Sequence, residues 1–251
     1  MRKPLIAGNW KMYKTVAETL DYIRRFRELV SGVTDREIMI APPFTALYPA
    51  GREVAGTNIR LGAQNAHWAE AGAFTGEVSS VMLKECGVTY VIIGHSERRH
   101  IFGETDEMVR KRLSGVLAVG LKPILCIGET LEEREAGKTF EVLERQVREA
   151  LSGFSNEDLK DLVIAYEPVW AIGTGKTATP EQAEEAHRYV RGVLGELFGR
   201  GFAEKLRILY GGSVKPQNIA DLMAQPDVDG ALVGGASLDP ETFAQIVKYG
   251  K

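Results

Sequence analysis

The feature that most constrains this chain is an alternation of short apolar runs with amphipathic segments along its 251 residues. Short runs of β-branched and other apolar residues are typical of buried strands, and apolar residues at a 3.6-residue spacing are typical of helices. Eight strands are predicted, at residues 5–8, 38–41, 59–62, 90–94, 123–127, 162–166, 206–210 and 231–233. The predicted helices cover residues 16–30, 46–54, 81–86, 106–118, 131–151 with a break near Gly137, 181–198, 219–223 and 240–249.

This alternation favours a single (β/α)8 barrel, with eight parallel strands inside an outer ring of helices. Strands that alternate with helices pair in parallel, and a barrel of this kind typically needs about 250 residues. The sequence has no linker or shift in composition, so we expect one barrel domain over residues 1–251. An open, doubly wound sheet is the alternative, but it would require a glycine-rich nucleotide fingerprint after the first strand, where Gly8, Asn9, Trp10 and Lys11 stand instead.

Charge and composition limit the partners that we expect. A net charge of −3 provides no broad basic surface for nucleic acid or for an anionic membrane. The apolar runs are too short for a membrane-spanning helix or a secretory leader. Cys86 and Cys126 show no CxxC spacing, which indicates free thiols in a reducing compartment. We therefore expect a cytoplasmic protein that binds neither nucleic acid nor a membrane.

Polar residues and glycines follow five of the predicted strands. In a barrel, the carboxyl ends of all strands meet at one face, where active sites lie. The residues at these ends are Asn9, Lys11, His95, Ser96, Glu97, Glu167, Gly211, Gly212, Ser213, Gly234, Gly235, Ala236 and Ser237. A carboxylate, an imidazole and a cation together suit acid–base chemistry. Glycine-rich loops after strands seven and eight are the usual phosphate site of such barrels, so an anionic small molecule is the expected substrate.

The segment after Glu167 is unusually apolar for a loop. It continues through residues 169–172 into a glycine-rich stretch, and Thr179 and Pro180 have the pattern of a helix N-cap and first helical residue. A packed loop beginning with a surface glutamate is one interpretation, and a cover over a site is the other. Residues 173–178 match the dinucleotide pattern only weakly, because their first glycine lies far from the strand. The nucleotidase phosphate loop is excluded, since it needs glycine at Trp170.

Other chemistries have little support in the sequence. The four histidines form no metal-ligand pair at helical spacing, so no metal is expected. Ser213 lies in GGSV rather than in the GxSxG of a serine nucleophile. Another phosphate-binding barrel, such as a sugar-phosphate epimerase or an aldolase, is an alternative enzyme. An aldolase would need a Schiff-base lysine inside the barrel, and the predicted strand interiors offer none. A non-catalytic scaffold is the remaining alternative, although it would have no use for Lys11, His95 and Glu167 together.

Five motifs in order along the chain carry a resemblance to a known family. They are NWK at 9–11, IIGHSERR at 92–99, AYEPVWAIGTGK at 165–176, YGGSV at 210–214 and LVGGASL at 232–238. The chain closely resembles the triosephosphate isomerases over essentially its whole length. The resemblance implies a TIM barrel that interconverts dihydroxyacetone phosphate and D-glyceraldehyde 3-phosphate, in glycolysis and gluconeogenesis, with no cofactor and no metal.

The same resemblance implies a role for each motif residue. Glu167 becomes the base that moves a proton through an enediolate, His95 the neutral electrophile, Lys11 the cationic partner, Asn9 a substrate contact and Glu97 a support beside Lys11. The phosphate is expected on backbone N–H groups of Gly173, Ser213, Gly234 and Gly235, under a lid at residues 169–176. Burial under that lid is expected to make Glu167 more basic. A helix beginning after His95 is expected to oppose protonation of its imidazole, an assignment for which this enzyme family is itself the standard example.

The connection at residues 64–79 predicts an assembly. It is long, and its Trp68 and Phe74 would expose apolar area in a monomer. A loop folded back on its own barrel is the alternative. In the resembling family this loop enters the neighbouring subunit of a homodimer beside the loop that carries Asn9 and Lys11, and we expect the same here.

Overall fold

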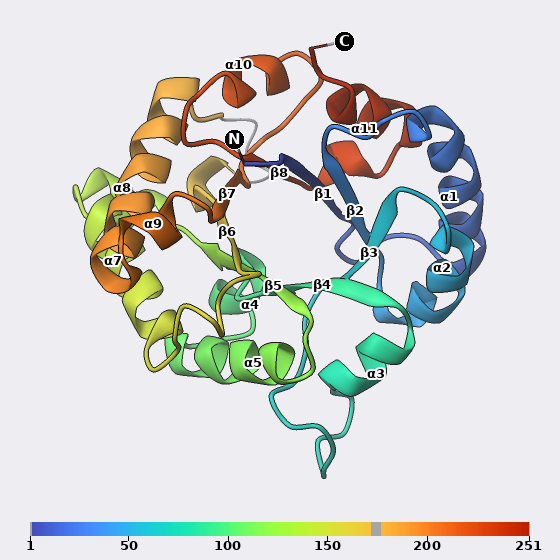
Figure 1. Cartoon of the computed structure of the whole chain (residues 1–251), viewed down its shortest axis with the longest axis horizontal. Coiled ribbons are helices and arrows are strands. Elements are labelled where there is room, and N and C mark those ends of the chain that lie inside the picture. The colour runs from blue at the N-terminus through green and yellow to red at the C-terminus, as the bar shows by residue number, and fades with distance from the viewer. Residues whose placement is uncertain (1, 172–176, 251) are drawn as a thin grey trace.

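Eight parallel strands close into one barrel in the computed structural model, which describes residues 2–171 and 177–250 (Figure 1). Each strand pairs with the next along the chain, and the last pairs with the first through the register Leu5 with Gly230. The strands are β1 (Leu5–Asn9), β2 (Glu37–Ala41), β3 (Ile59–Ala63), β4 (Val88–Ile93), β5 (Lys122–Ile127), β6 (Val163–Tyr166), β7 (Arg207–Tyr210) and β8 (Gly230–Val233). The predicted single closed barrel is confirmed.

Helices surround the barrel on its outer side (Figure 1). They are α1 (Val16–Val30), α2 (Leu47–Val54), α3 (Ser80–Glu85), α4 (Ser96–His100), α5 (Asp106–Ala118), α6 (Leu131–Glu135), α7 (Thr139–Leu151), α8 (Pro180–Phe198), α9 (Arg200–Ala203), α10 (Ile219–Met223) and α11 (Pro240–Val247). Short 3-10 turns lie at η1 (Phe44–Ala46), η2 (Val169–Ala171) and η3 (Gly235–Ser237). The expected break near Gly137 is confirmed, because α6 ends before this residue, which has a φ of 72°.

Side-chain caps explain where several helices begin. Thr15 accepts a hydrogen bond from Glu18 N–H and Glu18 reaches back to Thr15, which fixes the start of α1. Thr179 and Gln182 form the same reciprocal cap at α8, with Pro180 as its first residue. The sequence prediction of this start is therefore confirmed.

The barrel interior is filled with side chains that alternate along the strands. These inward residues are Leu5, Ala7, Met39, Ala41, Tyr90, Ile92, Ile124, Cys126, Val163, Ala165, Leu209 and Leu232. Met39 fills the space that Gly62 leaves on the neighbouring strand, since a Cβ on Gly62 would lie 2.4 Å from the Met39 sulfur. A second apolar layer packs between the outer face of the strands and the helices. The strand interior is thus a packed core, and any small-molecule site must lie at one of its ends.

The amino-terminal end of the barrel is closed by a polar cluster. The Tyr90 hydroxyl donates to Glu37 Oε2 at 2.6 Å, and Arg207 donates both to this oxygen, at 2.5 Å, and to the Tyr90 hydroxyl, at 3.0 Å. Burial raises the pKa of Tyr90 to about 12, which keeps its donor proton in place. This end of the barrel is therefore sealed by groups that satisfy one another.

The connection between β3 and α3 projects from the barrel as a narrow tip (Figure 1). Residues 70–77 are exposed along it. Phe74 packs against His67 with ring centroids 4.1 Å apart, yet 43% of its surface remains exposed, and Trp68 is half-buried. The tip thus presents apolar surface away from its own barrel.

Candidate active site

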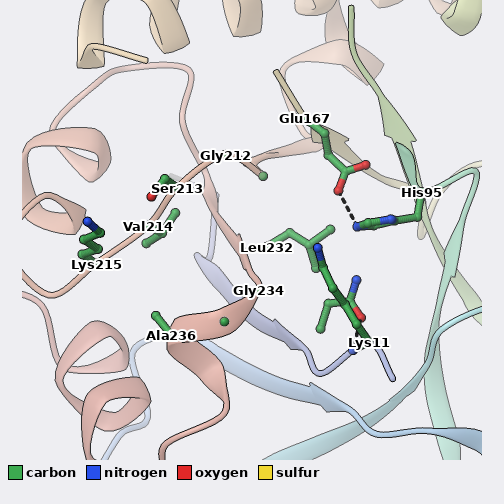
Figure 2. A pocket seen from close by; sticks show the side chains of 13 residues that line it. Lys11, His95, Glu167, Gly212, Ser213, Val214, Lys215, Leu232, Gly234 and Ala236 are labelled. Atoms are coloured by element: carbon green, nitrogen blue, oxygen red, sulfur yellow. Dashed lines mark hydrogen bonds and ion pairs between the residues drawn. The ribbon is translucent and has the colours of Figure 1, made fainter. Parts of the chain in front are cut away.

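A cavity of about 250 Å³ opens at the carboxyl ends of the strands (Figure 2). Its lining comes from the ends of β1 and β8 and from the loops after β1, β4, β6, β7 and β8: Asn9, Lys11, His95, Glu167, Gly211, Gly212, Ser213, Val214, Lys215, Leu232, Gly234, Gly235 and Ala236. Of the residues to which the resemblance gives a role in catalysis or substrate binding, the lining includes all except Gly173 and Glu97. Gly173 lies outside the described residues, and Glu97 stands behind Lys11, with which it forms an ion pair.

Glu167 follows β6 and is buried, with a relative exposure of 2%. One carboxylate oxygen lies 2.9 Å from His95 Nε2, and the other accepts the Ser96 N–H at 3.0 Å. Two glycines make room for this residue. A Cβ on Gly211 would lie 2.7 Å from Glu167 Cγ, and a Cβ on Gly128 would lie 1.8 Å from its carbonyl oxygen.

The acidity of Glu167 differs from the sequence expectation. Burial alone raises the pKa of this carboxyl, as expected, but contacts with His95, the Ser96 N–H and the Lys11 charge more than offset burial and lower it. The expectation of a more basic carboxylate is therefore wrong for this arrangement of the side chain. The sequence could not show that both oxygens would find donors.

His95 lies two residues after β4 and is the N-cap of α4, so a helix does begin after it. The Glu97 N–H points at His95 Nδ1 over 3.3 Å, which requires a lone pair on that nitrogen and leaves a proton on Nε2, facing Glu167. Burial favours the neutral imidazole, whereas the Glu167 carboxylate outweighs it and raises the pKa of His95. Protonation at Nδ1 would cost the contact with the Glu97 N–H.

Lys11 is held in an unusual backbone conformation, with a φ of 51°. Its N–H donates to Asn9 Oδ1 at 3.0 Å, and its carbonyl accepts from Gln64 Nε2 at 2.8 Å. The ammonium group lies 2.6 Å from Glu97 Oε1. Asn9 thus holds the Lys11 backbone by a hydrogen bond within the site. Glu97 lies beside Lys11, as predicted. Gln64 was not predicted as a site residue, although it follows β3 as the site residues follow their strands.

The glycine-rich loops form the other side of the cavity (Figure 2). Gly234 and Gly235 lead into the short turn η3, where the Ser237 N–H and hydroxyl both donate to the Gly234 carbonyl, at 2.8 and 2.7 Å. Ser213 is steadied by Asn218, whose amide donates to its carbonyl at 3.0 Å. A side chain at Gly235 would meet open space, so the backbone itself borders the cavity. Such a surface suits an anion that hydrogen-bonds to N–H groups.

The expected lid lies partly outside the described residues, which resume at Thr177. At its start, Glu129 accepts from the Trp170 indole N–H at 2.9 Å and from the Tyr166 hydroxyl at 3.2 Å. At its far end, the Ala178 N–H donates to the Tyr210 hydroxyl at 3.3 Å. Neither Glu129 nor Tyr210 was predicted from the sequence as an anchor. Glu129 directly follows Gly128 after β5, which was the available signal.

Within residues 2–171 and 177–250, no group of three or more histidine, cysteine, aspartate or glutamate side chains could hold a metal ion. None of the helices over the same residues is long and apolar enough to cross a membrane. Cys86 and Cys126 are free thiols in the structure, and burial raises the pKa of both.

Comparisons with known proteins agree with one another. A family model described as triosephosphate isomerase matches residues 4–250. The chain is 57% identical over 249 residues to the triosephosphate isomerase of Geotalea uraniireducens, and 56% identical over 248 residues to that of Carboxydothermus hydrogenoformans, with 99% of each chain covered in both cases. It is also similar to the crystal structure of triosephosphate isomerase from Bartonella henselae, with a TM-score of 0.88, 42% identity and 97% of each chain covered.

Proposed function

The chain belongs to the triosephosphate isomerase family and is an isomerase, and on that premise we propose that it interconverts dihydroxyacetone phosphate and D-glyceraldehyde 3-phosphate through an enediolate. The observation that carries the proposal is the contact between Glu167 and His95 in a cavity that also holds Lys11 and two glycine-rich loops. A base, a hydrogen-bond donor for oxygen, a cation and an anion cradle are what this proton transfer needs.

Glu167 is the proposed base. Both of its oxygens are engaged by His95 and the Ser96 N–H, so it must rotate away from at least one donor before it can take a proton from substrate carbon. Leaving those donors removes the contacts that lower its pKa, while burial remains. The base therefore becomes stronger as it moves toward the substrate.

His95 is the proposed electrophile, and it acts through its Nε2 proton. Once Glu167 rotates, this N–H is free to donate to the substrate oxygens, and the Glu97 N–H at Nδ1 keeps the proton on the correct nitrogen. The charge of Lys11 stabilises the developing enediolate oxygen, with Glu97 holding the ammonium group and Asn9 contacting both Lys11 and substrate. Departure of Glu167 also removes the carboxylate that raises the pKa of His95, which favours the neutral ring.

Backbone N–H groups of Gly173, Ser213, Gly234 and Gly235 are the proposed phosphate ligands, under a lid at residues 169–176. An enediolate phosphate exposed to water would lose its phosphate group by elimination, so a closed lid protects the intermediate. The Glu129 and Tyr210 contacts support hinges at the two ends of this segment. Trp170 fluorescence is expected to change when a phosphorylated transition-state analogue is added, and an unchanged spectrum on saturation would argue against closure.

A homodimer is also proposed. Apolar side chains stay exposed on loops and helices that follow β1, β3 and β4, including Met12, Phe74, Met82, Ile101 and Phe102. In the barrel β3 and β4 are adjacent and only β2 separates β3 from β1, and the loops after β1 and β4 also carry Lys11 and His95. A second copy that covers this surface would bury its apolar area and steady the catalytic loops.

We further propose that residues 1–251 form one domain and that the enzyme works in the cytoplasm, in glycolysis and gluconeogenesis. The two free thiols support a reducing compartment. The decisive experiment on function is an assay of the purified enzyme with glyceraldehyde 3-phosphate, with and without a chelator. Turnover that the chelator leaves unchanged supports a metal-free isomerase, and no turnover refutes the proposal.

A further inference from the structure

Lys215 lines the same cavity but has no role in the chemistry proposed above. It follows Ser213 and Val214 on the loop between β7 and α10. Figure 2 shows it beyond Ser213 and Val214, on the side of the cavity away from the Glu167 and His95 pair. Lys215 is thus a cation at the end of the site where the phosphate group is expected.

The backbone beneath Lys215 is fixed by a single asparagine. The Lys215 N–H donates to Asn218 Oδ1 at 2.8 Å, and the Asn218 amide donates to the Ser213 carbonyl at 3.0 Å. The Lys215 carbonyl accepts from the Asn218 and Ile219 N–H groups, both at 3.2 Å. The loop therefore holds Ser213 and the base of the Lys215 side chain in one rigid turn, whatever side chain stands at position 215.

The Lys215 ammonium group has no ion-pair partner among the described residues around the cavity. Lys11, the other lysine of the lining, already pairs with Glu97 at 2.6 Å. Across the part of the chain that the structure describes, no ion pair or side-chain hydrogen bond engages the Lys215 ammonium group, and the residue is exposed. Glu167 adds a buried negative charge to the site, and the whole chain carries a net charge of −3. A doubly negative substrate would meet a repulsive field without a local positive charge.

We propose that Lys215 is a capture residue, whose charge attracts the phosphate group of the substrate toward the Ser213, Gly234 and Gly235 cradle and speeds association. This inference rests on the proposed function. The cradle offers neutral N–H donors, which act only at hydrogen-bond distance, whereas an ammonium group acts over about 10 Å at moderate salt. Lys215 thus favours the approach of negatively charged substrates before they reach hydrogen-bond distance. It takes no part in proton transfer.

The test compares Lys215→Gln, Lys215→Glu and Lys215→Arg with wild type at about 0.01 M and about 0.5 M salt, which span strong and weak screening. At low salt we expect kcat/KM to fall about three- to tenfold in the glutamine variant, and further in the glutamate variant, mainly through KM. The arginine variant should keep wild-type values, and all differences should shrink at high salt. Lys205→Gln is the matched control, because Lys205 lies near the start of β7 at the opposite end of the barrel and makes the same change in net charge.

Inorganic sulfate separates this inference from the proposed function. Its affinity, measured by titration calorimetry, should fall in Lys215→Gln and not in Lys205→Gln, whether or not the enzyme turns over triose phosphate. Wild-type enzyme without isomerase activity would refute the proposed function alone. Equal sulfate affinity in wild type and Lys215→Gln, or a loss of kcat/KM that persists at high salt, would overturn the role of Lys215.

Discussion

Replacing Glu167 by glutamine changes a carboxylate that accepts hydrogen bonds through both oxygens. His95 Nε2 lies 2.9 Å from one oxygen, and the Ser96 N–H donates to the other at 3.0 Å. A glutamine has one acceptor oxygen and one NH2 group, so either the His95 Nε2–H or the Ser96 N–H must face the NH2 group, which is itself a donor. Leaving a buried donor unsatisfied costs about 1 to 3 kcal/mol. The expected fall in Tm is about 2 to 12 °C for a chain of this length.

The kinetic effect of this substitution is expected to be much larger than its effect on stability. A general base is worth about 100- to 10,000-fold in rate, or roughly 3 to 5.5 kcal/mol of barrier. Glutamine cannot take the proton from substrate carbon, so kcat falls while the phosphate cradle and KM are retained. Steady-state kinetics and thermal unfolding on one preparation measure both effects.

Glu37→Gln separates a loss of base from a loss of stability. Glu37 accepts from Tyr90 and Arg207 at the far end of the barrel, so its substitution also leaves buried donors without a charged partner. We expect this variant to lose stability and to keep wild-type kcat. A kcat for Glu167→Gln within about threefold of wild type would remove Glu167 from the role of base. An equal loss of kcat in Glu37→Gln would show that the effect comes from instability.

Three further predictions test the packing, the electrostatics and the assembly. Burial lowers the pKa of His187 from 6.5 to about 4, so the unfolded chain binds a proton between these pH values that the folded chain does not. The protonation of His187 should lower the free energy of unfolding by about 3 kcal/mol as pH falls from 7 to 4. In urea titrations, His187→Gln should reduce the dependence of the free energy of unfolding on pH. An unaltered pH dependence would contradict the lowered pKa of His187. Gly211→Ala should displace the Glu167 side chain, whose Cγ would lie 2.7 Å from the new Cβ, and lower kcat at least about tenfold. Gly201→Ala is the control, because its new Cβ meets open space. Equal kcat values in the two variants would show that the pocket relaxes around the added methyl group. Shortening the loop at residues 73–77 should give a folded monomer with a much reduced kcat. Sedimentation velocity measures its assembly and the isomerase assay measures its kcat. A shortened monomer with full activity would contradict the link between assembly and activity.

The barrel could be predicted from sequence because each strand is a short apolar run followed by a helix of recognisable period. The break near Gly137 was also predictable, since glycine favours the positive φ found there. The start of α4 after His95 was expected, but the short helix α9 was missed, because four residues are too few to show a period. The start of β4 at Val88 was also missed, since Thr89 interrupts its apolar run.

The candidate site was predictable as a set of residues but not as a set of contacts. Topology alone brings Lys11, His95 and Glu167 to one end of the barrel. Which donors meet the Glu167 carboxylate depends on side-chain rotation, and the expected sign of its pKa shift was wrong for that reason. The clamp of Gln64 on Lys11 likewise joins groups that are far apart in the chain, and no local pattern reports it.

The left-handed backbone conformation of Lys11 lowers stability at a position whose side chain is needed for activity. A φ of 51° disfavours any side chain with a Cβ, at a cost of roughly 1 to 2 kcal/mol that glycine would avoid. The residue in this conformation is nevertheless the one that carries the cation of the site. Selection for heat resistance alone should therefore enrich glycine or asparagine at position 11, and selection for turnover should restore lysine. Under the two pressures, the same position would evolve in opposite directions.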